Sequence, residues 1–267
     1  MAYINLPNIN FNIKELNITF FENNENKNNV YISNSLNYYL TNIKKQITTY
    51  NIYWDNYKKI TNPYEYIHTP TKNNKLSVCK YKPLSRSFFK MIEIINVFGF
   101  LKEYNNIKSF HLAEGPGGFI EAFNFTRDNK NDIYYGITLI SDDINIPSWK
   151  KSNHYLNNNK KIIIETGASK TGDLFLEENF IYCYTNFKAS IDYITADGGF
   201  DFSLDFDKQE DTSFKLIIAQ VLYAIVMQKT NGNFILKIFD IFKYKTIEVI
   251  FLLSNLYENV YIYKPHT

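Results

Sequence analysis

The sequence predicts an α/β fold, in which a mostly parallel sheet is covered by helices on both faces. Two observations predict it. Along residues 85–267, short apolar runs of strand length alternate with longer segments whose apolar residues recur at helical spacing. Residues 109–125 also read as a buried strand, a glycine turn and a helix in direct succession. Strands separated by helices pair in parallel, with right-handed crossovers.

Length and charge limit the protein classes to consider. The 267 residues suffice for one main α/β domain with an extension. The formal net charge is only +2, so no general affinity for polyanions follows, and any nucleic-acid surface must be a local cluster. No apolar run approaches the roughly 20 residues that a membrane helix needs. A soluble, intracellular protein is therefore expected.

Cysteines and histidines indicate no metal site. Cys79 and Cys183 lie far apart in sequence, which predicts two buried thiols in a reducing compartment rather than a disulfide or a metal centre. The histidines show no ligand spacing, and His111 inside an expected strand reads as a core residue with its hydrogen bonds satisfied. No metal is expected.

Residues 1–60 are expected to form an N-terminal extension, and residues 61–267 the main domain. The asparagine-rich run 22–29 is typical of a loop, while residues 33–50 carry apolar side chains at helical spacing. Within the next segment a basic cluster favours either a solvated surface or contact with RNA. Its members are Lys72, Lys75, Lys80, Lys82 and Arg86.

Residues 85–100 predict an apolar helix that ends near Gly99. Lys90 and Glu93 are the two ionisable residues among its apolar positions. One of them could face solvent. Alternatively, Lys90 points into a site, where burial would lower its pKa.

The glycine turn at residues 114–118 can bring the backbone close to a ligand, and N–H groups of the following helix are expected to face the same place. Glu114 would add a negative charge there, which suits a cationic or hydroxyl-rich ligand. The glycine spacing is not that of the dinucleotide motif GxGxxG. A cofactor pocket and a plain strand-to-helix turn both remain open.

Further strands are expected at residues 133–140, 161–166, 191–196, 232–239 and 259–264, with helices at 214–228 and 244–257. Ligands of parallel sheets bind beyond the carboxyl ends of the strands, where Glu114, Asp173, Asp197 and Lys237 are expected. Lys237 stands in an apolar run and needs an acidic neighbour, for which Asp197 is the candidate. The pair either holds the rim together or belongs to a ligand site.

Several motifs in this chain occur together in one known family. They are HLAEGPGGF, DYITADGGFDFS, the pair Gln209–Glu210 before a long helix, FILKIFDIF and the helix segment PLSRSFFKMIEI. Over residues 62–267 the chain thereby resembles the FtsJ/RrmJ-like S-adenosylmethionine-dependent RNA 2'-O-methyltransferases, in particular their cap-specific mRNA branch. The resemblance implies a Rossmann-like methyltransferase fold with a doubly wound, mostly parallel sheet.

The resemblance also implies a Lys-Asp-Lys-Glu catalytic tetrad, whose first three members match Lys90, Asp197 and Lys237. The family's glutamate belongs to a Ser-Arg-Pro-x-Asn-Ser-Glu pattern that follows a Lys-Pro-x-Thr segment, here residues 264–267. The glutamate and the final antiparallel strand are thus expected to be absent from these residues. The chain is then a fragment of a longer protein or, alternatively, a shortened and catalytically impaired relative.

The implied cofactor is S-adenosylmethionine, and the implied activity is methyl transfer to a ribose 2'-hydroxyl at the 5' end of capped mRNA. Lys237 would act as general base or orienting group, with Asp197 near the sulfonium and Asp173 at the adenine amino group. Other capping or transcription proteins are further candidate partners, in the cytoplasm for a viral protein and in the nucleus for a cellular one. The alternatives are a ribosomal or transfer RNA 2'-O-methyltransferase and a noncatalytic RNA-binding scaffold. The residues implied to bind the cofactor are Glu114, Gly115, Pro116, Gly117, Gly118, Phe119, Asp173 and Asp197.

Overall fold

The computed structural model describes residues 3–8, 31–70, 77–101, 105–127, 129–143, 146–199 and 209–267. Lys72, Lys75, the asparagine-rich run 22–29 and residues 200–203 of the motif DYITADGGFDFS lie outside these ranges. The chain divides into two compact units. The first comprises Met1–Ile60, Phe202–Phe214 and Ile238–Lys264, and the second comprises Thr61–Asp201, Lys215–Lys237 and Pro265–Thr267.

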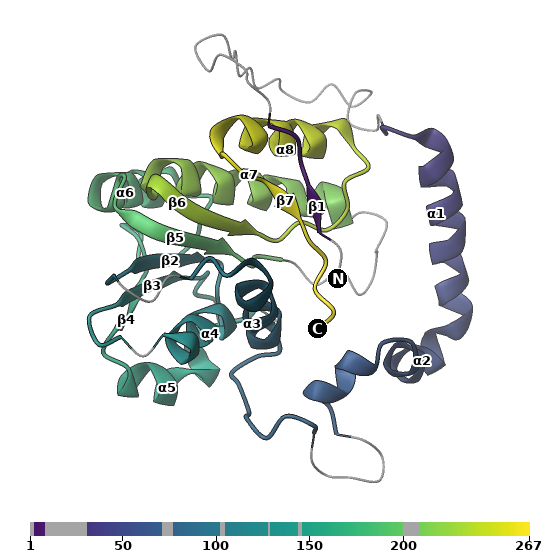
Figure 1. Ribbon diagram of the computed structural model, residues 1–267, viewed down its shortest axis with the longest axis horizontal. Helices are drawn as coiled ribbons and strands as arrows, with labels where there is room; N and C mark the ends of the chain where they lie inside the picture. The colour runs from purple at the N-terminus through teal and green to yellow at the C-terminus, as the bar shows by residue number, and fades with distance from the viewer. Residues whose placement is uncertain are drawn as a thin grey trace. The chain divides into compact units, whose positions relative to one another are not determined.

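A five-stranded parallel sheet forms the centre of the second unit, with strand order β4-β3-β2-β5-β6 (Figure 1). The chain runs outward from β2 through β3 to β4 and then returns to β5 and β6 on the other side of β2. The order therefore reverses between β2 and β5. The strands are β2 (Lys108–Leu112), β3 (Ile133–Ile137), β4 (Ile162–Glu165), β5 (Ile191–Ala196) and β6 (Gln228–Leu236).

Helices cover both faces of this sheet (Figure 1). One apolar cluster unites it with α3 (Ser87–Phe98), α4 (Gly118–Thr126) and the turn η4 (Trp149–Lys151), which leads into α5 (Asn153–Asn158). A second cluster unites it with α6 (Glu177–Phe187) and the part of α7 (Gln209–Met227) that belongs to this unit. The predicted α/β fold with a doubly wound parallel sheet is confirmed.

The helix predicted over residues 85–100 is α3, and its end has a clear local cause. Gly99 adopts φ +57 and donates its N–H to the Ile95 carbonyl at 2.8 Å. A left-handed residue directly after the last turn is a common helix terminator, and glycine adopts it without steric cost. Ahead of α3, the short turn η3 (Pro63–Ile67) starts at Asn62, whose side chain accepts the Tyr64 N–H.

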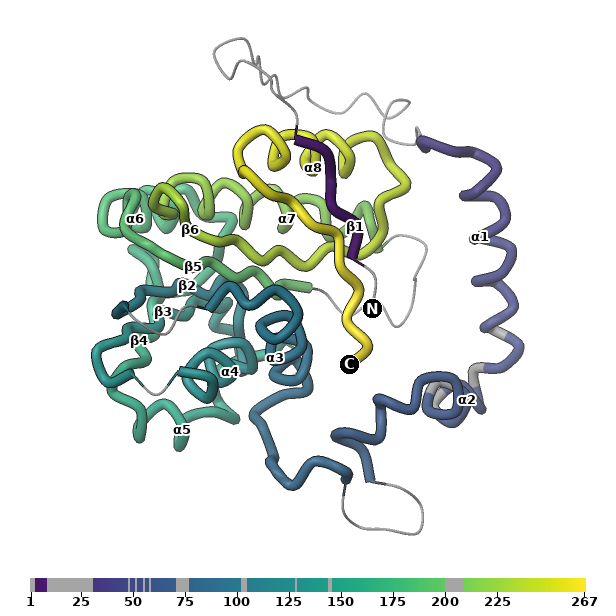
Figure 2. The backbone as a smooth tube through the Cα atoms, viewed as in Figure 1, coloured from purple at the N-terminus to yellow at the C-terminus, as the bar shows by residue number. Residues whose placement is uncertain are grey.

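The first unit contains α1 (Asn34–Ile47), η2 (Thr48–Tyr53), most of α2 (Trp54–Thr61) and α8 (Tyr244–Leu256). Its strands β1 (Ile4–Asn5) and β7 (Tyr261–Ile262) pair antiparallel, as Figure 2 shows. The segment predicted as a sixth strand of the main sheet is this β7, so that prediction was wrong about its partner. An apolar run indicates a strand but carries no information about which strand it joins.

Glu210, from the Gln209–Glu210 pair, caps α8 within the first unit. Its Oε1 accepts the Lys243 N–H at 2.9 Å and the Thr246 hydroxyl at 2.6 Å. A carboxylate at a helix amino end satisfies N–H groups that have no partner inside the helix. This motif residue therefore has a structural role.

The two cysteines differ in burial. Both are free, but only Cys183 is buried, while Cys79 is partly exposed, so the prediction of two buried thiols holds for Cys183 alone. Within the described ranges, no helix combines the length and apolar character that crossing a bilayer requires.

Candidate active site

The register of the central strands brings the predicted site residues to one edge. Leu112 of β2 pairs with Ala196 of β5, and Ala196 pairs with Leu236 of β6. Because the strands are parallel, the residues that follow, Ala113, Asp197 and Lys237, emerge side by side. This edge is the carboxyl end of the sheet, at the point where the strand order reverses, and α/β sheets bind their ligands there.

Asp197 and Lys237 form the predicted ion pair. The Lys237 Nζ lies 2.9 Å from the Asp197 Oδ1 and donates a hydrogen bond to the Asp197 backbone carbonyl at 2.7 Å. The approach to Oδ1 lacks hydrogen-bond geometry, so it is an electrostatic contact, while the carbonyl receives the hydrogen bond. Two oxygens of one residue thus fix the ammonium at the rim.

Lys90 reaches the same charges from α3. Its side chain is partly buried, and burial is the main reason why its pKa is lowered. Asp197 opposes this shift, whereas Lys237 and Arg86 add to it. The structure therefore places the partly buried Lys90 side chain close enough to Asp197 and Lys237 for both charges to act on it.

Glu114 occupies the end of β2 and is 4% exposed. Its Oε1 accepts the Phe119 N–H at 2.7 Å and the Ile120 N–H at 3.2 Å. The helix N–H groups that were expected to face a ligand are therefore taken by Glu114 itself. The sequence alone could not reveal these hydrogen bonds, because they form only when the Glu114 carboxylate folds back over the turn that follows it.

The second oxygen of Glu114 has different surroundings. Oε2 is buried and has no hydrogen-bond partner among the described residues. Burial raises the pKa of Glu114 well above its ordinary value, and the nearby Asp197 raises it further, while the hydrogen bonds from Ile120 and Phe119 and the charge of Lys237 oppose the shift. The negative charge expected here is thus costly to bury.

The glycine turn is shaped by Gly117, which adopts φ +110 and donates its N–H to the Glu114 carbonyl at 2.8 Å. Side chains rarely tolerate this conformation, so glycine is needed where α4 begins. Gly115 and Pro116 are partly buried, and Gly118 is buried. The Phe119 side chain is 3% exposed and packs in the apolar core, so only its main chain faces the turn.

Asp173 lies at the same edge over the other half of the sheet. Its neighbours Thr171 and Gly172 bond to Ile140 and Thr166, which follow β3 and β4. The Asp173 Oδ1 accepts the Phe175 N–H at 2.8 Å, which closes a tight turn. Asp173 is therefore placed at the rim, but away from the group formed by Lys90, Asp197 and Lys237.

His111 is the core residue that its position in a strand predicted. It is fully buried, its Nε2 lies 2.7 Å from the Ser109 hydroxyl, and its Nδ1 lies 2.8 Å from the Thr195 hydroxyl. Burial lowers its pKa to about 3. The imidazole is therefore neutral near pH 7 and serves the packing of β2 against β5.

Glu93 has a role that the sequence did not reveal. It follows Lys90 by one turn of α3, and its Oε1 accepts the His266 N–H at 2.9 Å. Its Oε2 accepts the Thr267 hydroxyl, also at 2.9 Å. Glu93 thus ties residues 265–267 to the helix that carries Lys90. The only signal in the sequence was an acidic residue three positions after Lys90, on the same side of the helix.

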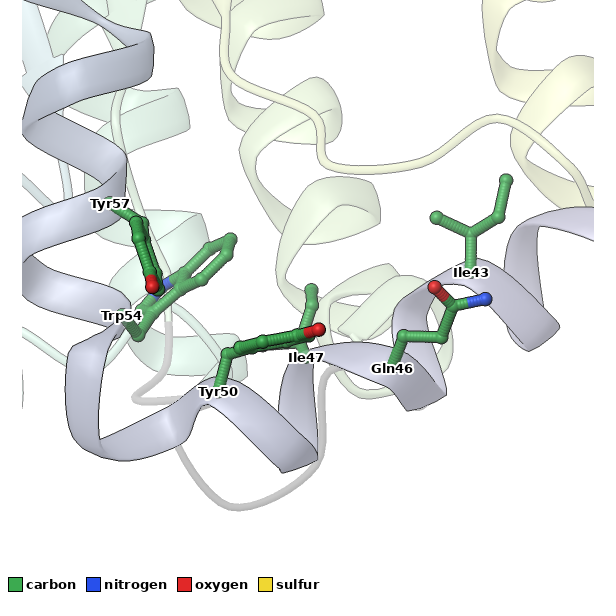
Figure 3. A pocket seen from close by; sticks show the side chains of 6 residues that line it. All are labelled: Ile43, Gln46, Ile47, Tyr50, Trp54 and Tyr57. Carbon is green, nitrogen blue, oxygen red and sulfur yellow. The ribbon is translucent and has the colours of Figure 1, made fainter.

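A separate, open depression of about 390 Å³ lies within the first unit and contains none of the predicted site residues. Figure 3 shows its lining side chains, which project from α1, η2 and α2. They are mainly apolar and aromatic and include no carboxylate, lysine, arginine, histidine or cysteine. The lining residues are Ile43, Gln46, Ile47, Tyr50, Trp54 and Tyr57.

Known proteins with similar sequences include cap-specific and viral methyltransferases. The chain is 26% identical over 196 residues to a zebrafish (Danio rerio) protein named cap-specific mRNA (nucleoside-2'-O-)-methyltransferase 2, a match that covers 68% of this chain and 26% of that protein. It is 29% identical over 206 residues to an African swine fever virus protein named "probable methyltransferase", a match that covers 68% of this chain and 45% of the viral protein. The matches thus span less than half of either relative.

Comparison with solved structures finds a protein described as a ribosomal RNA methyltransferase from Plasmodium falciparum, with a TM-score of 0.44 and 20% identity over 64% of this chain and 85% of that chain.

The family profile of the FtsJ-like methyltransferases matches residues 83–267, which is more than half of the chain. The matched region includes Lys90, the glycine turn, Asp197 and Lys237. The chain therefore belongs to the FtsJ-like methyltransferase family.

Proposed function

We propose that this protein transfers a methyl group from S-adenosylmethionine to a ribose 2'-hydroxyl near the 5' cap of mRNA. The observation that carries the proposal is the convergence of Lys90, Asp197 and Lys237 at the reversal point of the sheet. Three charged side chains that are partly withdrawn from water at a ligand-binding edge are typical of a catalytic site. The family provides the reaction class, and the cap-specific relative supports the substrate.

The residues at this edge suit a positively charged donor. The buried Oε2 of Glu114 lacks a partner among the described residues, and Asp197 adds a second carboxylate. A ligand that carries an ammonium and a sulfonium would balance both acids. When bound, S-adenosylmethionine supplies a methyl group on a positively charged sulfur, and Asp173 is the candidate contact for its adenine.

The two lysines are suited to different tasks. The Lys237 ammonium is fixed by Asp197, so it acts as a hydrogen-bond donor that orients the ribose hydroxyl. Lys90 has a lowered pKa and is therefore the better proton acceptor as the hydroxyl reacts. Holding the hydroxyl in line with the methyl group supplies much of the acceleration in such a displacement.

Basic residues next to α3 support an RNA substrate. Lys80 and Lys82 are exposed, and the side chain of Arg86, at the start of α3, is 58% exposed. Such groups neutralise phosphates, and their proximity in sequence to Lys90 would direct the RNA backbone toward it.

The proposal is tested with short RNAs of one sequence that differ only in the presence of a 5' cap. We expect the protein to methylate the capped RNA and to leave the uncapped RNA nearly unmodified. Equal methylation of both would favour a ribosomal or transfer RNA methyltransferase. RNA binding without any methyl transfer would favour the noncatalytic scaffold.

A further inference from the structure

Gln220 stands out among the buried side chains because its amide is unused. It lies on α7, is 0% exposed, and neither its nitrogen nor its oxygen has a hydrogen-bond partner among the described residues. A buried amide carries two donors and an acceptor that water would otherwise satisfy, so leaving all of them unpaired destabilises the fold. An apolar side chain of similar size would avoid this cost.

The position of the amide links it to the candidate active site. A Cβ atom built on Gly198 would meet the Gln220 Nε2 at 2.1 Å, the Leu216 Cδ2 at 2.9 Å and the Ala113 Cβ at 3.0 Å. Gln220 therefore lies directly behind the residue that follows Asp197. Only a glycine at position 198 lets the Gln220 amide pack this close to the main chain.

Two chain segments turn at this point. Ala113 follows β2 and adopts φ +52, a strained conformation for a residue with a side chain. Gly198 follows β5, and the next residue, Gly199, is exposed. The Gln220 amide thus backs the turns at the ends of β2 and β5, between which ligands of such sheets bind.

One carboxylate oxygen of the nearby Glu114 also lacks a hydrogen-bond partner among the described residues. Its Oε2 is also buried and unpaired among the described residues, one position after Ala113. Beside the ends of β2 and β5, the Gln220 amide and the Glu114 Oε2 thus have no hydrogen-bond partner among the described residues. Such groups are expected where a bound molecule completes the structure.

We propose that Gln220 is a positioning residue whose amide forms hydrogen bonds with the main chain of the turn at residues 197–199 only when the methyl donor is bound. The inference rests on the proposed function. A donor bound between the ends of β2 and β5 would lie next to residues 197–199, and a small rotation of one of their peptide groups would bring an N–H or a carbonyl to the amide. Donor binding then recovers hydrogen bonds that the free protein lacks.

The test combines two measurements on Gln220→Met, which keeps the shape of the side chain and removes the amide. We expect the melting temperature of the ligand-free variant to rise by about 2–4 °C, because an unpaired buried amide is removed. We expect the dissociation constant for S-adenosylmethionine, measured by isothermal titration calorimetry, to rise about tenfold. A residue important only for packing would not combine higher stability with weaker binding.

Leu216→Met is the matched control, since Leu216 touches the same glycine from the same helix and has no polar atom. It should leave the dissociation constant within about twofold of the parent value. Unchanged donor binding in Gln220→Met, a lower melting temperature, or an equal loss of binding in the control would each overturn the inference. A parent protein that does not bind S-adenosylmethionine would contradict the proposed function, and the inference with it.

Discussion

Two buried carboxyl groups at opposite edges of the sheet behave in opposite ways. Asp132 precedes β3 at the amino edge and is 1% exposed, while Glu114 follows β2 at the carboxyl edge and is 4% exposed. Burial would raise the pKa of each. The pKa of Asp132 is nevertheless lowered, whereas that of Glu114 is raised well above its ordinary value.

The partners explain the difference. Asp132 accepts hydrogen bonds from Arg127 at 2.6 and 3.0 Å, from the Ile107 N–H at 3.0 Å and from the Tyr134 hydroxyl at 2.9 Å. Glu114 has two main-chain donors and faces the like charge of Asp197. A buried charge with its partners in place supports the fold, while one without them is costly unless a ligand completes it. The amino edge is therefore structural, and the carboxyl edge is suited to binding.

Removing Lys237 should produce the largest effect at the carboxyl edge. We expect Lys237→Ala to lower methyl transfer to capped RNA by at least about a thousandfold, because the hydroxyl loses its oriented donor. Donor binding should remain within a few-fold of the parent. Lys229→Ala is the matched control, since Lys229 lies near the start of the same strand and pairs with Asp192. A Lys237→Ala protein with normal transfer would remove Lys237 from the mechanism.

Breaking the ion pair at the amino edge should affect stability instead. Arg127→Met leaves the Asp132 carboxylate buried without its cation, and we expect the free energy of unfolding to fall by about 3–5 kcal/mol. Transfer activity per folded molecule should not change. Denaturant titration measures the free energy of unfolding. Lys229→Met is the control, because the Lys229 side chain in its pair with Asp192 is about half exposed. We expect this control to lower the free energy of unfolding by less than about 1 kcal/mol. A small effect of Arg127→Met would contradict the structural role of this edge.

Asp173 tests whether donor recognition extends across the edge to β3 and β4. We expect Asp173→Ala to weaken S-adenosylmethionine binding about tenfold, as the loss of one charged hydrogen bond to a bound base would. Isothermal titration calorimetry measures the change. Glu177→Ala, an exposed substitution in the first turn of α6, is the control. Equal affinities of Asp173→Ala and the parent would exclude Asp173 from the donor site.

Glu114 should make stability depend on pH in the direction opposite to Asp132. Because folding raises the pKa of Glu114, the folded state binds more protons than the unfolded state above its ordinary pKa, and stability falls as pH rises through that window. Glu114→Gln cannot ionise, and its amide oxygen can still accept the Phe119 N–H. We expect the stability advantage of the variant over the parent to grow as the pH rises above the ordinary pKa of a glutamate. Parallel stability curves in denaturant titrations would contradict this assignment.

The pairing of Asp197 with Lys237 could be predicted from the sequence, because each residue stands out from its immediate neighbours along the chain. Lys237 stands in an apolar run and Asp197 ends a strand, so their pairing followed from the cost of an unpaired charge and the adjacency of parallel strands. The end of α3 was likewise readable from Gly99. The bounds of β5 match the predicted ones, because the apolar run ends abruptly at Asp197.

Contacts that depend on how the chain folds back on itself could not be predicted in this way. The return of the Glu114 carboxylate onto α4, the tie between Glu93 and residues 265–267, and the pairing of β7 with β1 depend on three-dimensional closeness that periodicity does not encode. Gln220 belongs to the same class. The sequence of a long apolar helix would suggest that its one glutamine faces solvent. The structure shows instead that Gln220 is buried and packs against Gly198.

Hydrogen–deuterium exchange with and without S-adenosylmethionine tests the division between the two edges most directly. Our account predicts that the donor slows amide exchange in the segments that end β2 and β5, around residues 113–119 and 197–199, and leaves residues 105–108 and 129–133 at the amino edge unchanged. Protection confined to the amino edge, or no protection in either segment at saturating donor, would contradict it.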